Sequence, residues 1–183
     1  MEIRRTSNKC IKLTLPNGKA VDVLSTVLDE IFRWIQNEDT KPESGGYIVG
    51  YQHEKTGNIS LESVSTPYLL DRKSRVRFDI CDPQHNLFLK KAYRRKSYYM
   101  GVWHTHPQGV PTPSSIDWDD WNATMKADKT GCQYVFFIIA GTDEWRLWVG
   151  DFQTMEITEA KEFMKDADGI YKKEGLEEDE KNN

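Results

Sequence analysis

Two histidines and one aspartate lie at spacings that suit a metal ion. His104 and His106 are two residues apart, and Asp117 follows them after a proline-rich stretch. Side chains two apart at the end of a strand share one face of the sheet, so both imidazoles can reach the same ion. Two imidazoles and a carboxylate are a common ligand set for catalytic zinc, and three protein ligands leave the fourth tetrahedral position to water. Zinc lowers the pKa of that water and polarises carbonyl groups. The spacing therefore predicts a zinc site.

A hydrolytic zinc site also needs a base for the water, and Glu43 is the candidate. It stands just before Gly45 and Gly46, at the start of an expected strand. Paired glycines allow two backbones to approach closely. A carboxylate in a water-poor cleft can have its pKa raised enough to carry protons. Taken by its spacing alone, Glu43 could equally be an ordinary loop residue.

Ser114 and Asp117 also fit a purely structural interpretation. Ser-x-x-Asp is a variant of the helix capping box, with aspartate in the place of glutamate. Asp119 and Asp120 fit the same idea, because carboxylates in a first helical turn complement the helix dipole. The two interpretations are compatible, since a carboxylate that binds a metal must be held by some fixed element.

The elements that must position these residues alternate between strands and helices. Prolines and a glycine make residues 107–113 a loop, and the apolar run 134–140 is typical of a buried central strand. Apolar residues at helical spacing predict a helix from Val23 to Ile35. Other strands are expected at residues 9–15, 47–51, 59–64, 76–78, 98–103, 145–149 and 152–157, with helices at 82–95 and from Ser114 or Ser115 to Gly131. This mixture predicts an α/β sandwich built on one mixed sheet and flanked by helices.

Composition and charge exclude several classes. The 183-residue chain has a formal net charge of -4, which does not suit a nucleic-acid binder. Its basic run at residues 90–96 has helical spacing and predicts a solvated helix face. Neither a bilayer-spanning apolar stretch nor a signal peptide is expected. The three cysteines are far apart, which favours a reducing, cytoplasmic setting without disulfides.

At this point the sequence resembles a known family. Glu-Ser-Gly-Gly-Tyr-Ile-Val-Gly from Glu43, His-Thr-His-Pro from His104, and then Ser114 and Asp117 are similar to the JAMM motif of the JAB1/MPN/Mov34 metalloproteases, over about residues 20–150. The resemblance implies that His104, His106 and Asp117 bind Zn²⁺. It also implies that Glu43 is the general acid and base, and that Ser114 helps to stabilise the oxyanion. The implied fold is the cytidine-deaminase-like α/β sandwich. The implied activity is cleavage of isopeptide or peptide bonds at the C-terminus of ubiquitin or a ubiquitin-like protein.

The short chain resembles the stand-alone prokaryotic members of that family. Some of these accompany ubiquitin-transfer-like enzymes in anti-phage operons of the CBASS type, where they remove a conjugated nucleotidyltransferase from its targets. That likeness implies a ubiquitin-like protein or a nucleotidyltransferase conjugate as substrate. We expect a single metalloprotease domain over residues 1–168 and a charged, disordered tail over residues 169–183.

Two other functions can be weighed against this one. A zinc deaminase would suit the implied fold, but that class needs His-x-Glu and Pro-Cys-x-x-Cys segments, and the chain has neither. A non-catalytic scaffold of MPN type is disfavoured because every ligand position is filled.

Three further expectations concern residues around the site. The charged segment Asp71–Phe78 is a candidate wall of a groove that holds an extended substrate tail, although a plain exposed connector is the alternative. His53 and His85 are expected at the surface. The tryptophans are expected mostly in the core, with a cleft position open for two of them; they are Trp103, Trp118, Trp121, Trp145 and Trp148.

Overall fold

The computed structural model describes residues 10–161, 163–165 and 171–173. In these residues the helices are α1 (Ser25–Phe32), α2 (Gln84–Arg94) and α3 (Ser115–Ala127). The strands are β1 (Ile11–Thr14), β2 (Ala20–Val23), β3 (Gly45–Gln52), β4 (Ile59–Val64), β5 (Arg72–Ser74), β6 (Arg77–Asp79), β7 (Tyr98–Thr105), β8 (Tyr134–Ala140), β9 (Trp145–Asp151), β10 (Glu156–Glu159), β11 (Phe163–Lys165) and β12 (Tyr171–Lys173).

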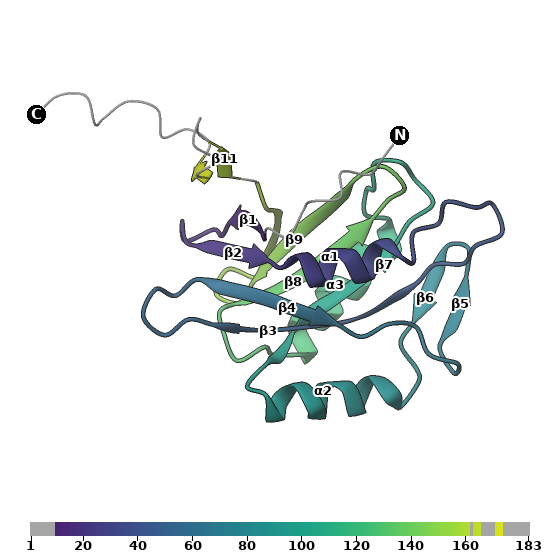
Figure 1. Cartoon of the computed structure of the whole chain (residues 1–183), viewed down its shortest axis with the longest axis horizontal. Coiled ribbons are helices and arrows are strands. Elements are labelled where there is room, and N and C mark those ends of the chain that lie inside the picture. Colours follow the sequence, from purple (N-terminus) through teal and green to yellow (C-terminus); the bar gives the residue numbers. More distant parts are fainter. Residues whose placement is uncertain (1–9, 162, 166–170, 174–183) are drawn as a thin grey trace, which may run out of the picture.

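One mixed sheet of eight strands organises the molecule (Figure 1). Its order is β1-β2-β4-β3-β7-β8-β9-β10. The pairs β2–β4 and β7–β8 are parallel, and the other neighbours are antiparallel. The short strands β5 and β6 form a separate hairpin beside the sheet. The expected α/β sandwich with a mixed sheet is confirmed.

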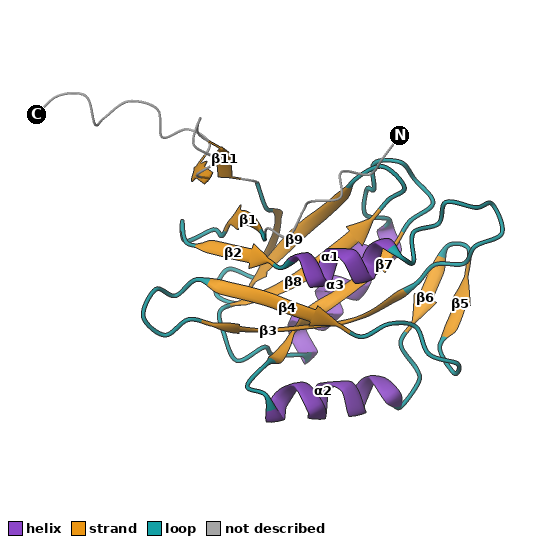
Figure 2. Cartoon of the chain, viewed as in Figure 1, coloured by secondary structure: helices purple, strands orange, loops and turns teal. Residues whose placement is uncertain are grey.

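Helices cover both faces of the sheet, as Figure 2 shows. Strand β8 is fully buried, and its alternate side chains enter two different apolar clusters. Phe136 and Ile138 belong to the cluster that contains Leu28 of α1. Phe137 packs on the opposite face against Trp121 of α3, with stacked rings whose centroids are 4.7 Å apart. The core therefore lies in two layers, one on each side of β8.

The start of the chain differs from the predicted pattern. A strand, β2, occupies Ala20–Val23, and helix α1 runs only from Ser25 to Phe32. Val21 and Val23 are fully buried on the sheet, while Asp22 between them pairs with Lys12 at 3.2 Å. Val23 fits both a two-residue and a four-residue apolar spacing, so its spacing could not separate the strand from the helix.

Two further boundaries were predicted wrongly. Residues 152–155 form a turn, with Met155 at φ 57°, and strand β10 begins at Glu156. Helix α3 ends at Ala127, ahead of the Gly131 stop signal. Most of the expected tail at 169–183 lies outside the described residues, apart from Tyr171–Lys173, which pairs with β11. The domain boundary at residue 168 stays a prediction.

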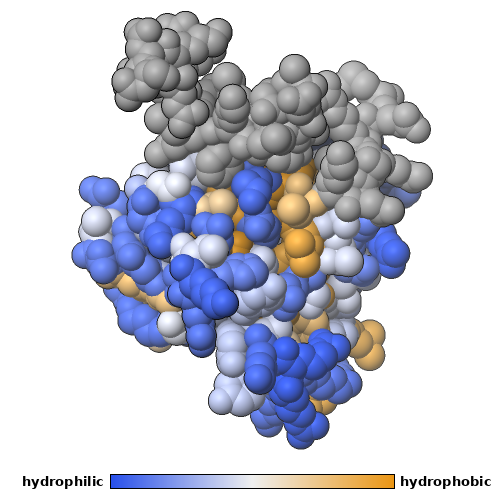
Figure 3. Space-filling model, turned by 60° about the vertical axis from the view of Figure 1, so that its left-hand side comes forward, coloured by the Kyte–Doolittle hydropathy of each residue, from blue (hydrophilic) through white to orange (hydrophobic). Residues whose placement is uncertain are grey.

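The basic run behaves as a solvated helix face. Lys90, Lys91, Arg94 and Arg95 are all exposed at the end of α2. Figure 3 shows a hydrophilic surface in the lowest part of the molecule, where Figure 1 places α2. In the described part of the chain, no helix has the length and the apolar character needed to cross a membrane.

Gly101 in β7 offers a test of how tightly the central strands pack. It has φ 151°, and a Cβ atom placed on it would lie 1.8 Å from the carbonyl oxygen of Phe136 in β8. We expect Gly101→Ala to lower the free energy of unfolding by about 3 kcal/mol, because both the dihedral angle and the contact are unfavourable. Urea unfolding monitored by tryptophan fluorescence measures this change.

The matched control is Gly131→Ala. Gly131 also has a positive φ, 78°, but nothing lies within 4 Å of its Cβ position. We expect Gly131→Ala to lower the free energy of unfolding by only about 1 kcal/mol, because it meets the left-handed conformation but no steric contact. Equal losses for the two variants would contradict the proposed role of the β7–β8 contact.

Candidate metal centre

The two histidines lie at the C-terminal end of β7, a strand in the middle of the sheet. His104 lies opposite Gly45 of β3 and Ile139 of β8. The N–H of His106 donates to the carbonyl of Ala140 at 2.9 Å, so the second histidine continues the ladder past the end of the strand. Both imidazoles point to the same side, with their Nε2 atoms 3.0 Å apart.

Helix α3 supplies the carboxylate from its first turn. Ser114 is the N-cap residue, and its Oγ accepts the N–H of Asp117 at 3.2 Å. In return Asp117 Oδ2 accepts the N–H of Ser114 at 2.6 Å and its hydroxyl at 2.8 Å. This is the predicted capping box. It fixes the position of the Asp117 side chain, which points toward the histidines.

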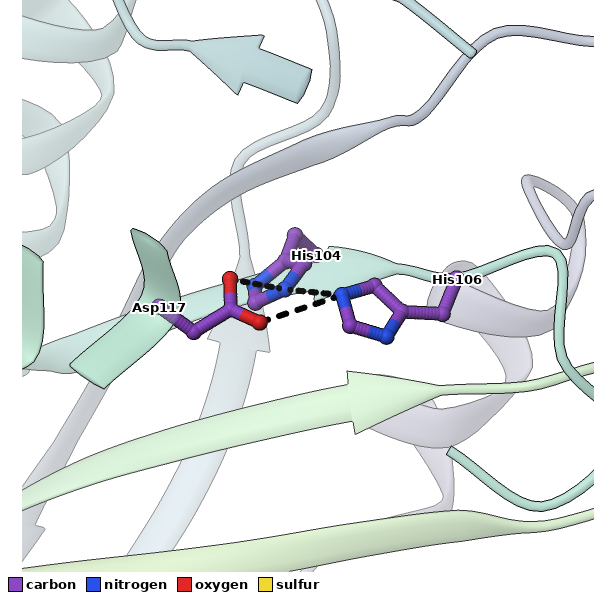
Figure 4. Close-up of side chains that lie close together, drawn as sticks. All are labelled: His104, His106 and Asp117. Atoms are coloured by element: carbon purple, nitrogen blue, oxygen red, sulfur yellow. Dashed lines mark hydrogen bonds and ion pairs between the residues drawn. The ribbon is translucent and has the colours of Figure 1, made fainter. Parts of the chain in front are cut away.

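The three side chains form a compact group of potential metal ligands (Figure 4). Asp117 Oδ1 lies 3.0 Å from His104 Nε2, and its Oδ2 lies 3.3 Å from His106 Nε2. Ligand atoms bound at 2.0–2.1 Å to a tetrahedral zinc ion are roughly 3.3 Å apart. The nitrogen and oxygen donors and their spacing therefore fit a zinc ion.

Gln108 is a residue of this site that the sequence did not single out. Its Oε1 lies 3.2 Å from His106 Nδ1 and also accepts the N–H of Thr112 at 2.9 Å. If Nδ1 donates to Gln108, the lone pair of Nε2 is left to face Asp117 and a metal. Such a partner orients a ligating histidine. The position two residues after His106 was the only available signal.

Glu43 lies beside this group in a buried position. Its side chain is 7% exposed, and its Oε1 is 3.9 Å from His106 Nε2. Burial, together with the charge of Asp117, raises the pKa of Glu43 to about 7, although His106 and Arg77 oppose this rise. The carboxyl group can therefore accept and release a proton near neutral pH.

The pKa values of Asp117 and His106 shift in the directions expected of a carboxylate and an imidazole that form a close ion pair. Burial alone would raise the pKa of Asp117, but hydrogen bonds from His104 and His106 outweigh it and hold that pKa well below its usual range. Burial alone would lower the pKa of His106, but the hydrogen bond and the charge of Asp117 outweigh it and raise that pKa. Asp117 thus stays ionised, as a ligand must.

A cleft of about 470 Å³ opens next to the candidate ligands. One wall is α3, with Ile116 and Asp120, and the other is the β5–β6 hairpin, with Val76 and Arg77. Arg77 forms an ion pair with the opposite wall, since its Nη1 lies 3.5 Å from Asp120 Oδ2. The segment Asp71–Phe78 is therefore part of a hairpin that borders the cleft.

The structure brings together all five residues predicted for the site. His104, His106 and Asp117 form one cluster, Ser114 caps the helix that carries Asp117, and Glu43 faces His106. Trp121 lies in the core and also lines the cleft, while Trp118 is 36% exposed. The prediction that His85 lies at the surface was wrong: it is 1% exposed, because Asp71 and Ser65 satisfy both ring nitrogens.

Comparison with known proteins gives the family. Residues 25–150 match the family model of prokaryotic homologs of the JAB domain. The chain belongs to this family. The resemblance seen in the motif is thereby confirmed, and the matched range contains Glu43, both histidines and Asp117.

Relatives of this JAB-domain chain carry a functional name. It is 27% identical to the "CD-NTase/cGAS isopeptidase" of Vibrio cholerae serotype O1 over 142 residues, covering 75% of this chain and 85% of the relative. It is 26% identical to the protein of the same name from Escherichia coli strain TW11681, covering 79% and 89% of the two chains. A solution structure of a Desulfitobacterium hafniense protein shares the fold, with a TM-score of 0.51 and 17% identity over 75% of this chain and 87% of that one.

The metal content of the purified protein tests the ligand set. We expect about one zinc ion per chain after dialysis against zinc, and none in the double variant His104→Ala/His106→Ala, because one carboxylate cannot hold the ion alone. Elemental analysis measures both values. His53→Ala is the control, since His53 contacts Ser60 away from the cluster and should leave the zinc content unchanged. A wild-type protein without metal would overturn the assignment.

The buried Glu43 should also give the metal-free protein a distinctive pH dependence. Its pKa is about 7 in the folded state and about 4.5 when unfolded, so the folded state loses stability as the pH rises between these values. Glu43→Gln should therefore be more stable than wild type by about 3 kcal/mol at pH 8 and by less than about 1 kcal/mol at pH 5. Urea unfolding in the presence of a chelator measures both differences. A pH-independent difference would show that Glu43 is not held in a desolvated position.

Proposed function

We propose that this chain is a zinc-dependent isopeptidase of the JAMM type. The observation that carries the proposal is the placement of buried Glu43 at 3.9 Å from His106, beside a group of three potential ligands. Three protein ligands leave one position for water or substrate. A proton carrier next to such a position is what hydrolysis of an amide bond requires.

The names of the relatives support the substrate class. Two relatives are called CD-NTase/cGAS isopeptidase, and each matches most of this chain. We infer that the substrate is a conjugate in which the C-terminus of a nucleotidyltransferase of this class, or of a ubiquitin-like protein, is joined to a lysine of a target. The biological setting we propose is deconjugation in a cytoplasmic anti-phage system of the CBASS type, by the single domain of residues 1–168.

Each site residue has a role in this proposal. Zn²⁺ held by His104, His106 and Asp117 would supply a Lewis acid that polarises the scissile carbonyl and acidifies water. Glu43 takes the proton from the attacking water and passes it to the leaving lysine amine. Ser114 donates its hydroxyl hydrogen to the oxyanion, after that hydrogen has rotated away from Asp117 Oδ2.

The β5–β6 hairpin would hold the substrate tail in an extended form. It lines the cleft through Arg72 and Val76, opposite the side chains of α3. An extended peptide that adds to a strand edge is bound by main-chain hydrogen bonds. A flexible C-terminal tail is suited to this mode because it can lie along the cleft with its last residue at the ligands.

The test is cleavage of a defined conjugate. The substrate is a CD-NTase joined through its C-terminus to the ε-amine of a lysine on a reporter protein, and mass spectrometry identifies the bond that is broken. We expect cleavage after the last CD-NTase residue, and none after the metal has been removed with a chelator. Zinc-loaded protein that leaves both this conjugate and the matching ubiquitin-like conjugate intact would favour the non-catalytic scaffold.

Glu43→Gln should separate metal binding from chemistry. The glutamine keeps the size of the side chain but cannot carry a proton, so kcat should fall by a factor of about 10²–10⁴ while the zinc content stays unchanged. Steady-state kinetics on the conjugate and elemental analysis measure the two quantities. Glu54→Gln, at an exposed position, is the control and should match wild type. Full activity of Glu43→Gln would mean that another group moves the proton.

A further inference from the structure

A second cluster of titratable and nucleophilic side chains lies outside the metal centre. His85 of α2 places its Nε2 2.7 Å from Asp71 Oδ2 and its Nδ1 2.7 Å from Ser65 Oγ. Since an ionised carboxylate only accepts hydrogen bonds, Nε2 carries the proton that faces Asp71. The other nitrogen of a neutral ring then accepts the hydroxyl of Ser65. The order Asp–His–Ser is that of a hydrolytic triad.

Burial excludes a catalytic role for this network. Ser65 and His85 are each 1% exposed, so no substrate can reach the hydroxyl group. The serine oxygen is also occupied, because it accepts the N–H of Tyr47 at 2.8 Å. Every polar side-chain atom of Asp71, His85 and Ser65 has a partner, so the three residues form a fully satisfied buried polar network. Such networks fix a single arrangement of the elements that they join.

Asp71 closes the base of the β5–β6 hairpin. Its Oδ1 accepts the N–H groups of Cys81 and Asp82, both at 2.9 Å, and its Oδ2 accepts the N–H of Tyr68 at 2.8 Å. The first two donors follow β6, whereas Tyr68 precedes β5. One buried carboxylate therefore ties together the two chain ends from which the hairpin extends.

Ser65 joins this clamp to the strands that carry the site. Its carbonyl oxygen accepts the indole N–H of Trp103 at 2.9 Å, and Trp103 is the residue before His104. Its N–H donates to the carbonyl of Tyr47 in β3. A Cβ atom on Gly46 would lie 2.1 Å from the carbonyl oxygen of Ser65, so this close approach of the two backbones requires glycine at position 46.

The far end of the hairpin holds Glu43. The carbonyl of Ser74 accepts the N–H of Glu43 at 2.8 Å, and the carbonyl of Arg75 accepts the side-chain amide of Gln36 at 2.9 Å. Glu43 thus depends on the hairpin for the one backbone hydrogen bond that its own N–H makes. A shift at the hairpin base would move Ser74 and, with it, Glu43.

We propose that Asp71, His85 and Ser65 are positioning residues of the hydrolytic site. They lock the β5–β6 hairpin against β3 and β7 and thereby hold Glu43 at its working distance from His106. This inference rests on the proposed function for its catalytic readout. The candidate metal ligands are not members of this network; they come from the end of β7 and the first turn of α3.

The experiment compares two serine variants that remove equivalent hydroxyl groups. Ser65→Ala breaks the network, whereas Ser60→Ala removes a buried hydroxyl that contacts His53 at 2.9 Å, away from the site. For Ser65→Ala we expect kcat on the CD-NTase–lysine conjugate to fall about 100-fold, as for a misplacement of roughly 1 Å. The KM should change much less than kcat, and the zinc content should stay unchanged, because the metal ligands are not part of the network. Ser60→Ala should retain the wild-type kcat.

Three results would overturn the proposal. They are an unchanged kcat in Ser65→Ala, an equal loss of kcat in Ser60→Ala, and a loss in Ser65→Ala that follows the loss of zinc. Both variants are assayed well below their unfolding temperatures. If the wild-type protein does not cleave the conjugate, the proposed function fails, and amide exchange then decides the positioning role.

Hydrogen exchange of the wild-type protein tests the clamp without any variant. The amides of Glu43, Cys81 and Asp82 should exchange with one common, slow rate of opening, because the network closes the base of the hairpin whose far end binds Glu43. Independent, fast exchange at Glu43, with Cys81 still protected, would show that the clamp does not hold Glu43. This measurement also applies if Ser65→Ala does not fold.

Discussion

The close approach of β3 to β7 brings the segment that carries Glu43 next to the candidate metal ligands. A Cβ atom on Gly45 would lie 2.7 Å from the carbonyl oxygen of Trp103, so only glycine allows the strands to meet at this point. The residue after Trp103 is the first candidate ligand, His104, and Glu43 comes two residues before Gly45. Glu43 and the candidate metal ligands are therefore neighbours because two backbones come into close contact.

The two carboxylates of the site are similarly buried, but their pKa values shift in opposite directions. Asp117 and Glu43 are both largely shielded from water, with side chains 12% and 7% exposed. Asp117 accepts hydrogen bonds from two histidines, which favour its ionised form, whereas desolvation dominates at Glu43 and favours the protonated form. Pairs of titratable groups whose environments push their pKa values apart divide acid–base work between them. The environment thus supports Asp117 as the ligand and Glu43 as the proton carrier, independently of any sequence motif.

Local patterns could be predicted from the sequence, and contacts between distant segments could not. His104 and His106 share a face because a strand has a two-residue period, and Ser114 and Asp117 form a capping box because a helix begins there. These are properties of a few consecutive residues. His85, by contrast, was placed at the surface because its partners Asp71 and Ser65 lie on other segments and leave no local trace. The strand at Val23 was missed for a different reason: its apolar spacing fits two periods.

The two walls of the cleft are held in place by different kinds of interaction. The α3 wall rests on apolar packing, with Trp121 stacked on Phe137 in the core cluster below it. Such packing fixes the helix that presents Asp117, so the position of this candidate ligand depends on the core. The hairpin wall rests on hydrogen bonds to a buried carboxylate, which are directional and fail when one partner is lost. The position of Glu43 follows this polar wall. The candidate ligand Asp117 and the candidate proton carrier Glu43 are therefore held by different kinds of contact, although Glu43 Oε1 lies only 3.9 Å from His106 Nε2.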